Sequence, residues 1–178
     1  ILKEVVIMCR MLIAAGEVNV SELMIAAIKM AKDTNSVHEF NIDKGPGSWV
    51  HDDGLGIAWL EGEEWKMFKS IKAIFNDPQV VQFNNLKSNY VMIHIRKKMG
   101  SETAMENTHP FHFQRRDVGN FIFCHNGYAG EGIKHCSSFK RKGKTDSEQL
   151  FYSVLTKMQN QDVKDSLQGT LNSIETTT

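Results

Sequence analysis

Residues 90–96 show the clearest alternation of apolar and polar side chains in the sequence. A period of two is that of a β-strand, whose successive side chains point to opposite faces of the sheet. The segment therefore predicts a strand with one apolar face and one face that carries polar groups. The first face holds Val91, Ile93 and Ile95, and the second holds Met92, His94 and Arg96.

Four other segments predict strands by their apolar content and by the turn residues around them. Residues 119–124 predict a second strong strand, while 54–60 and 65–68 predict the two strands of a hairpin. Residues 9–15 predict a short buried strand that ends at Gly16.

Helical patterns fall between and after these strands. Ser21 is expected to cap a helix that runs to about Lys32. Thr145 and Glu148 have the spacing of a capping box, which predicts a helix over 147–159. A last amphipathic helix has its apolar positions at Val163, Leu167, Leu171 and Ile174.

The remaining segments indicate the fold class and where function is concentrated. Residues 70–86 favour short helical pieces, and the order of elements lacks a strand–helix–strand alternation, so we expect an α+β layered domain. Residues 97–118 and 127–144 show no strong pattern. Connections longer than about 12–15 residues are usually functional or disordered, so both are candidate functional regions.

Composition excludes several classes of protein. The 178 residues correspond to about one domain, and 41% hydrophobic with 24% charged residues excludes disorder along the whole chain. Basic and acidic residues balance at 21 each, so no overall field attracts nucleic acid or acidic lipid. Apolar runs such as 11–15 are far shorter than the roughly 20 residues of a membrane span. We expect neither nucleic-acid nor membrane partners, and interpret the basic cluster at 140–144 as a solvated loop.

The three cysteines are Cys9, Cys124 and Cys136. An odd number without regular spacing is a poor disulfide framework and favours a reducing compartment. Lys3, Glu4 and Arg10 leave too short an apolar core between them for a signal peptide, so a cytoplasmic protein is expected.

Cys9 follows Met8, and this position has a chemical consequence. If Met8 were the initiator and were removed, Cys9 would carry a thiol and a free α-amine on adjacent carbons. Such an amine can act as the general base for its own side-chain nucleophile. The alternative is a small buried residue at the start of a strand.

Three further positions could carry chemistry, each with a plain structural alternative. Arg96 at the end of a strand could bind a carboxylate, or be a solvated arginine. The side-chain amide of Asn126 and the backbone N–H of Gly127 could stabilise an oxyanion, or simply close a hairpin turn. Asp146 could bind an ammonium group, or cap a helix.

A metal site is another class of function. Cys124-His125 and His135-Cys136 are adjacent pairs, but the ligand spacing of structural zinc sites is absent. Neighbours on a strand also point to opposite faces, so Cys124 and His125 cannot easily share an ion. No metal and no cofactor is expected.

Several short blocks, taken together and in their order along the chain, resemble the class II glutamine amidotransferase domain, a branch of the N-terminal nucleophile hydrolases. The similarity covers roughly residues 8–160 and is greatest to the small stand-alone members. The blocks are Met8-Cys9-Arg10-Met11, His51 to Trp59, His94-Ile95-Arg96, Asn107-Thr108-His109-Pro110-Phe111, His125-Asn126-Gly127 and Thr145-Asp146-Ser147-Glu148.

The resemblance implies a four-layer αββα sandwich of two antiparallel sheets and an enzyme that releases ammonia from glutamine or a related γ-glutamyl amide. A catalytically silent binding module of the same fold is the alternative. The implied nucleophile is Cys9, with its own amine as base and with Asn126 and Gly127 as oxyanion donors. The implied substrate-binding residues are Arg96 for the α-carboxylate, Asp146 for the α-amine, and Lys97 and His109.

The resemblance also bears on the chain as a whole. Residues 1–8 would be an extension or propeptide before the nucleophile, and 9–178 a single domain. Family domains usually continue with further strands, so either one sheet is short here or the domain is incomplete at its C-terminal end. Lys97-Lys98-Met99-Gly100 departs from the family pattern, so another γ-glutamyl amide is an alternative substrate. An ammonia acceptor would lie on a separate acceptor or synthetase subunit.

Overall fold

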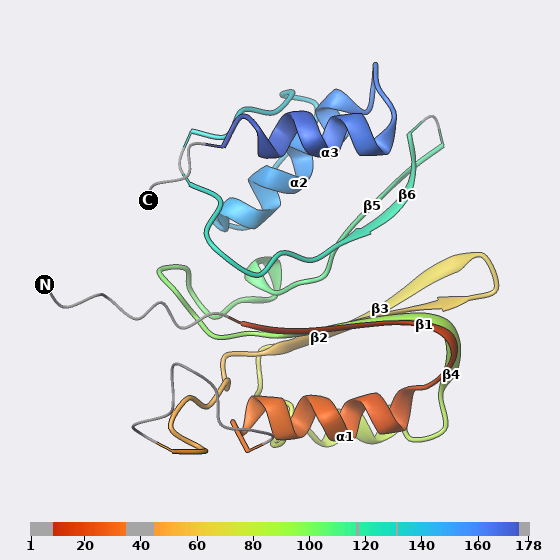
Figure 1. Ribbon diagram of the computed structural model, residues 1–178, viewed down its shortest axis with the longest axis vertical. Coiled ribbons are helices and arrows are strands. Elements are labelled where there is room, and N and C mark those ends of the chain that lie inside the picture. Colours follow the sequence, from red (N-terminus) through yellow and green to blue (C-terminus); the bar gives the residue numbers. More distant parts are fainter. Residues whose placement is uncertain (1–8, 35–44, 117, 131, 175–178) are drawn as a thin grey trace, which may run out of the picture.

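Four layers stack along the long axis of the molecule in the computed structural model, which describes residues 9–34, 45–116, 118–130 and 132–174 (Figure 1). Helix α1 (Val20–Ala31) covers one face of a four-stranded sheet, and helices α2 (Asp146–Lys157) and α3 (Val163–Leu171) cover a two-stranded sheet. The predicted four-layer α+β sandwich is confirmed. The strands are β1 (Arg10–Asn19), β2 (Leu55–Glu61), β3 (Glu64–Ser70), β4 (Lys87–Ile95), β5 (Phe111–Arg115) and β6 (Gly119–Phe123), and short 3-10 helices span Pro78–Phe83 and Met105–Asn107.

The larger sheet has the order β1-β4-β2-β3, and all of its neighbours are antiparallel. The alternation along β4 has the predicted effect, because its apolar face packs on α1 and its other face meets the second sheet. His94 lies on that second face and is fully buried. The core under the sheet includes Val91, Ile93 and Ile95 of β4 and Val20, Met24, Ala27 and Ala31 of α1.

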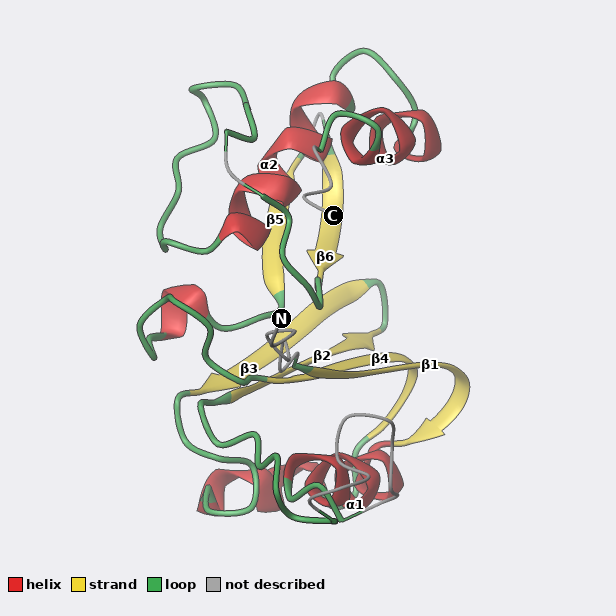
Figure 2. Cartoon of the chain, turned by 60° about the vertical axis from the view of Figure 1, so that its left-hand side comes forward, coloured by secondary structure: helices red, strands yellow, loops and turns green. Residues whose placement is uncertain are grey.

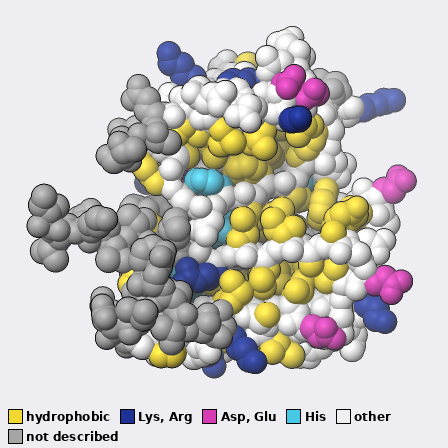
Figure 3. Space-filling model, viewed as in Figure 1, with side chains coloured by type: hydrophobic (Ala, Val, Ile, Leu, Met, Phe, Trp, Pro, Cys, Tyr) yellow, Lys and Arg dark blue, Asp and Glu magenta, His cyan; other side chains and the backbone are white. Residues whose placement is uncertain are grey.

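The two-stranded sheet of β5 and β6 packs on α2 through aromatic side chains. Phe123 stacks on Phe151 with ring centroids 5.0 Å apart. Apolar side chains also gather at the surface, on the visible face below the α2–α3 layer (Figure 3). The second core is smaller than the first. Its buried members are Phe111, Phe139, Phe151, Tyr152 and Leu155.

The structure corrects the predicted first strand. Strand β1 continues past Gly16 to Asn19 through an irregularity in its pairing between Ala15 and Val18. It is not buried, because it forms an edge of the sheet and Ile13 is 65% exposed. The next helix starts two residues early, and its cap is Asn19, whose side chain accepts from the amide of Ser21.

Two more expectations about local structure were wrong. The supposed loop at 97–118 contains β5, whose short alternation was overlooked. Helix α3 does not bury its apolar positions; it buries Ser166 and Thr170 instead. Its exposed apolar side chains are Val163, Leu167 and Leu171.

The helices of the described segments are too short or too polar to traverse a lipid bilayer. Residues 1–8, the expected extension, lie outside the described residues.

Candidate active site

A cleft lies between the two sheets, where strands β1, β4 and β6 bring their ends together. Arg10 pairs with Ile95, so the residue before β1 lies beside the residues that follow β4. Figure 2 shows β5 and β6 standing steeply across the larger sheet, which brings the end of β6 to the same place. All the predicted site residues line this cleft: Cys9, Arg96, Lys97, His109, Asn126, Gly127 and Asp146.

Cys9 is half-buried, and its sulfur contacts the backbone of the strand end opposite. Sγ accepts from the amide of Lys97 at 3.3 Å and lies 3.5 Å from the Lys97 carbonyl oxygen. Burial raises the pKa of the Cys9 thiol, and the Lys97 amide and the charge of Arg96 only partly oppose this effect. The thiol is therefore protonated near neutral pH and needs a base before it can attack a carbon.

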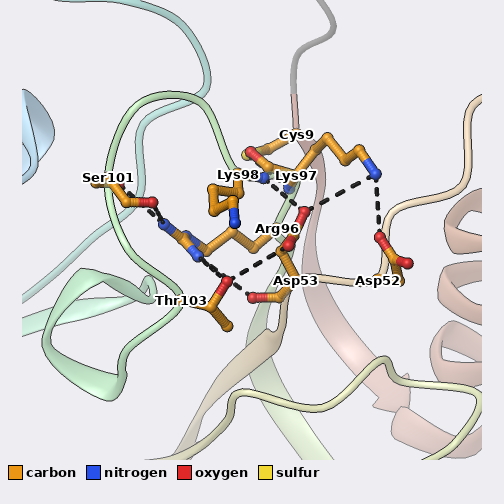
Figure 4. Close-up of polar contacts among 8 residues, drawn as sticks. All are labelled: Cys9, Asp52, Asp53, Arg96, Lys97, Lys98, Ser101 and Thr103. Carbon is orange, nitrogen blue, oxygen red and sulfur yellow. Dashed lines mark hydrogen bonds and ion pairs between the residues drawn. The ribbon is translucent and has the colours of Figure 1, made fainter.

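Arg96 is 3% exposed, which contradicts the alternative of a solvated strand-end arginine. Its guanidinium donates to the carbonyl and hydroxyl of Ser101, at 3.1 and 2.9 Å, and to the Glu102 carbonyl at 2.9 Å. It also reaches the Thr103 hydroxyl at 3.5 Å (Figure 4). A buried cation thus lies in the cleft, surrounded by neutral oxygens that a carboxylate could replace.

The sequence reasoning assigned no role to Asp53, although this residue fixes the segment that follows Arg96. Its Oδ2 accepts from the amide of Lys98 at 2.8 Å, and its Oδ1 accepts from the Thr103 hydroxyl at 3.4 Å. Figure 4 shows Asp53 between the two ends of this segment. The only signal in the sequence was its place in the block from His51 to Trp59.

Asn126 and Gly127 come after the end of β6 and line the cleft together with Cys9. The side-chain nitrogen of Asn126 donates to the Cys9 carbonyl oxygen at 2.9 Å. Gly127 has φ +148°, a backbone conformation that other residues rarely adopt, so glycine suits this turn. The side-chain amide of Asn126 is therefore bound to the backbone of Cys9, and Gly127 is the next residue along the chain.

Asp146 is the first residue of α2 and lies across the cleft. One oxygen accepts from the amide of Ala129 at 2.6 Å, and the other accepts from the amide of Ser147 at 2.8 Å. The helix cap is instead Thr145, which accepts from the amide of Glu148 at 3.3 Å. Asp146 thus carries its negative charge into the cleft on a helix start that other groups hold in place.

Lys97 and His109 reach the cleft in different ways. The ammonium of Lys97 pairs with Asp52 at 3.0 Å and lies 3.8 Å from Asp53, so its backbone is the part nearest Cys9. His109 is 5% exposed, and its ring lies 4.5 Å from that of Phe111.

Two more histidines line the cleft, and the sequence reasoning gave neither a role in the site. His94 is fully buried with its ring centroid 4.3 Å from that of His109. His125 Nδ1 is hydrogen-bonded to the Ser147 hydroxyl at 2.9 Å. Burial lowers the pKa of the imidazoles of His94, His109 and His125, to about 3 for His94, so all three are poor bases at neutral pH.

A larger cavity of about 510 Å³ adjoins the cleft. Its walls come from the segment after Arg96, the loop before α2 and the start of α2. Residues that line both spaces are Met99, Ser101, Thr145 and Asp146.

The described residues contain no cluster of three or more His, Cys, Asp or Glu side chains able to hold a metal ion. Cys124 was half of one adjacent Cys–His pair. Burial raises its pKa far above the ordinary range, so the thiol is not poised to become a metal-binding thiolate.

Proteins of one family resemble this chain in sequence. The family model of the class II glutamine amidotransferases matches residues 22–176. The chain is 38% identical over 121 residues to YafJ of Escherichia coli (strain K12), which is provisionally named a glutamine amidotransferase. That match covers 66% of this chain and 47% of YafJ. A Haemophilus influenzae protein with a similar provisional name is 37% identical over 106 residues, covering 57% of this chain and 35% of its own. The chain thus spans less than half the length of these relatives.

Solved structures show the same fold at lower identity. The glutamine phosphoribosylpyrophosphate amidotransferase of Bacillus subtilis superposes with a TM-score of 0.61 at 16% identity, over 94% of this chain and 33% of that one. A predicted glutamine amidotransferase from Pseudomonas aeruginosa PA01 superposes with a TM-score of 0.51 at 23% identity, over 75% of this chain and 56% of that one. By its sequence match and its fold, this chain belongs to the class II glutamine amidotransferases.

Proposed function

We propose that this domain releases ammonia from glutamine or a related γ-glutamyl amide, with Cys9 as the nucleophile. One observation carries the proposal: a thiol, two oxyanion donors and two opposite charges line a single cleft. Arg96 and Asp146 match the carboxylate and ammonium of an amino acid, while Asn126 and Gly127 lie beside the thiol. The family membership supports the same reaction.

The base in this proposal is the α-amine of Cys9, freed from the residues before it. A base is needed because burial raises the pKa of the thiol. The cleft histidines serve poorly, since the pKa of each is lowered by burial. Among the described residues, the hydrogen-bond partners of Sγ are backbone groups of Lys97 rather than a side-chain base. An amine on the adjacent carbon is already in reach of the thiol.

The reaction then runs in two steps, acylation of the Cys9 thiol and hydrolysis of the resulting thioester. The amine takes the thiol proton as sulfur attacks the amide carbon, and the oxyanion is bound by Asn126 and the Gly127 N–H. The C–N bond breaks, the leaving nitrogen takes the proton from the amine, and ammonia departs from a thioester. Water attacks the thioester, gives its proton to the amine, and sulfur leaves as the thiol, so that glutamate is released.

Substrate binding requires an exchange of partners at Arg96. The guanidinium now binds neutral oxygens of Ser101 and Glu102, and a substrate carboxylate would replace some of them. A carboxylate can accept two parallel bonds from one guanidinium and adds an opposite charge, which carbonyl and hydroxyl oxygens cannot do, so this exchange favours binding. Lys97 and His109 would contact the substrate from the adjacent walls. A separate acceptor or synthetase subunit would use the ammonia that the first step releases.

The test compares protein that begins at Cys9 with protein that keeps a residue before it. Intact mass establishes each N-terminus, and release of glutamate and ammonia from glutamine measures activity. A diazoketone analogue of glutamine then reports on the thiol by covalent labelling. Cys9→Ala is the matched control, because it removes the sulfur and keeps the fold.

We expect glutamate release and labelling only from the protein with a free Cys9 amine. Full activity from protein that retains the preceding residue would overturn the proposed base. Neither labelling nor turnover from the protein that begins at Cys9, with glutamine or γ-glutamyl amides, would instead support a silent binding module.

A further inference from the structure

Four buried polar atoms of the cleft make no well-formed hydrogen bond within the described residues, although the His94 ring also interacts with the backbone of His125. They are both ring nitrogens of His94, Nε2 of His109 and Oδ1 of Asn126. All three side chains line the same cleft as Cys9. Leaving a buried polar group unpaired is costly, so such groups in a cleft usually meet a ligand during function.

The two imidazoles are held in place from both sheets. His94 belongs to β4, and His109 lies just before β5, with ring centroids 4.3 Å apart. On the far side, the His109 ring packs on Phe111. Gly56 of β2 lies against the His109 backbone so closely that a Cβ there would collide with it. The rings are therefore fixed parts of the wall.

Both rings are neutral at physiological pH. Burial, followed by the charge of Arg96, lowers the pKa of His94 to about 3. Burial also lowers the pKa of His109, and nearby positive groups, Lys69 among them, add to the effect. A neutral imidazole offers one donor and one acceptor, which suits a small neutral molecule better than an ion.

The geometry of the reaction leaves one position for this pair. The tetrahedral carbon on Cys9 bears sulfur, an oxyanion, the rest of the substrate and the leaving nitrogen. Asn126 and Gly127 take the oxyanion, and the charged end of the substrate extends toward Arg96 and Asp146. The wall with unpaired groups is then left for the nitrogen.

We propose that His94 and His109 form a binding subsite for the small neutral amine that leaves the substrate and for the nucleophile that replaces it. This inference rests on the proposed function. The nucleophile of the second step approaches the acyl carbon from where the leaving group departed, because the two steps mirror each other. The subsite should thus accept ammonia, water and small primary amines such as hydroxylamine.

Hydroxylamine tests the subsite because it can take the place of water in the second step. Its nitrogen attacks the thioester carbon, the C–S bond breaks, and a proton passes from nitrogen to the thiol by way of the Cys9 amine. The products are a γ-glutamyl hydroxamate and free enzyme. In protein that begins at Cys9, the rate at which the preformed thioester is converted to hydroxamate should saturate with hydroxylamine concentration, because the amine binds before it attacks.

The variant His109→Asn should raise the half-saturating hydroxylamine concentration by about fivefold, as expected for the loss of one hydrogen bond. The half-saturating glutamine concentration should rise by a smaller factor than that of hydroxylamine, because a general distortion of the cleft would raise both values alike. His112→Asn is the matched control, because His112 is exposed on β5 and bonds Asn120. It should leave both values unchanged.

Each outcome decides the matter. A linear, unsaturable dependence on hydroxylamine in the unmutated protein would overturn the subsite, and this measurement requires no variant to fold. An unchanged half-saturation in folded His109→Asn would overturn it as well. If Cys9 is neither labelled nor acylated, the proposed function fails and the subsite fails with it, whereas labelling without saturation rejects the subsite alone.

Discussion

The amide nitrogen of Lys97 lies 3.3 Å from Sγ of Cys9. This contact joins Cys9 to the segment that carries Arg96 and the residues bonded to it. The pairing of β1 with β4 enforces the contact, because Arg10 lies opposite Ile95. The position of the thiol and the shape of the substrate-binding wall are therefore set by the same stretch of backbone.

Asp53→Asn should loosen that stretch. The carboxylate bonds the Lys98 amide and the Thr103 hydroxyl, and the neutral amide keeps only part of this bonding. We expect the glutamine KM to rise about tenfold, since a hydrogen bond to a charged group contributes about 1.5–3 kcal/mol. Steady-state glutaminase kinetics of protein that begins at Cys9 measures this change.

The control for Asp53→Asn is its neighbour Asp52. Asp52 pairs with Lys97, but its side chain is 55% exposed, and exposed ion pairs contribute little. Asp52→Asn should change KM less than about twofold. Equal effects of the two substitutions would show that Asp53 acts only through its charge near Lys97.

Arg96→Lys should damage binding and stability together. Lysine keeps the positive charge but cannot reach Ser101 and Glu102 at the same time as a guanidinium does. We expect a KM rise of about tenfold or more with a loss of about 1–3 kcal/mol in the free energy of unfolding. Denaturant unfolding and kinetics on the same sample check both. Reduced stability with an unchanged KM would reject Arg96 as a substrate contact.

Much of the fold could be predicted because the pattern of β4 was local and strong. Its apolar face meets α1 as expected, and the hairpin of β2 and β3 forms where the sequence placed it. The exposure of β1 could not be predicted, since edge position depends on strand order and not on the apolar content of the strand itself. Strand β5 was missed because its five residues follow a long stretch of turn residues.

The sequence predicted which residues gather in the cleft, but it did not predict their contacts. The capping-box spacing correctly placed Thr145, whose hydroxyl accepts from the Glu148 amide. Glu148 does not return the bond; its carboxylate accepts from the amides of Lys142 and Gly143 at 2.9 and 2.8 Å. The partners of this carboxylate depend on the path of the loop before α2, which the capping-box spacing does not show. The same holds for the bond of Asp53 to Lys98, 45 residues away.

Gly56→Ala should disrupt the join between the two sheets. A Cβ at this position would collide with the backbone of His109 and come within 2.7 Å of Pro110 Cδ. Neither neighbour can move without displacing the start of β5, so we expect a loss of about 2–4 kcal/mol in the free energy of unfolding. Thermal unfolding monitored by circular dichroism measures the loss.

Gly169→Ala is the matched control for Gly56→Ala. Gly169 lies in α3, where a Cβ would meet only the flexible end of Lys157, and alanine favours a helix by about 1 kcal/mol over glycine. Its substitution should leave stability unchanged or raise it. A Gly56→Ala protein as stable as the Gly169→Ala protein would contradict the tight contact at His109.

The buried histidines should make the protein sensitive to mild acid. His94 has a pKa of about 3 in the folded protein against 6.5 for an ordinary histidine, so between these values the unfolded chain binds more protons. Stability is therefore fully present above about pH 6.5 and falls as the pH drops toward 3. One such group should cost about 1.5 kcal/mol between pH 6.5 and pH 5, a window above the titration of ordinary carboxylates.

Urea unfolding at several pH values measures how steeply the free energy of unfolding depends on pH. His94→Gln should reduce this slope by the contribution of one proton, while the exposed His112→Gln should not. An unchanged slope in folded His94→Gln would mean that His94 does not stay neutral in the folded state.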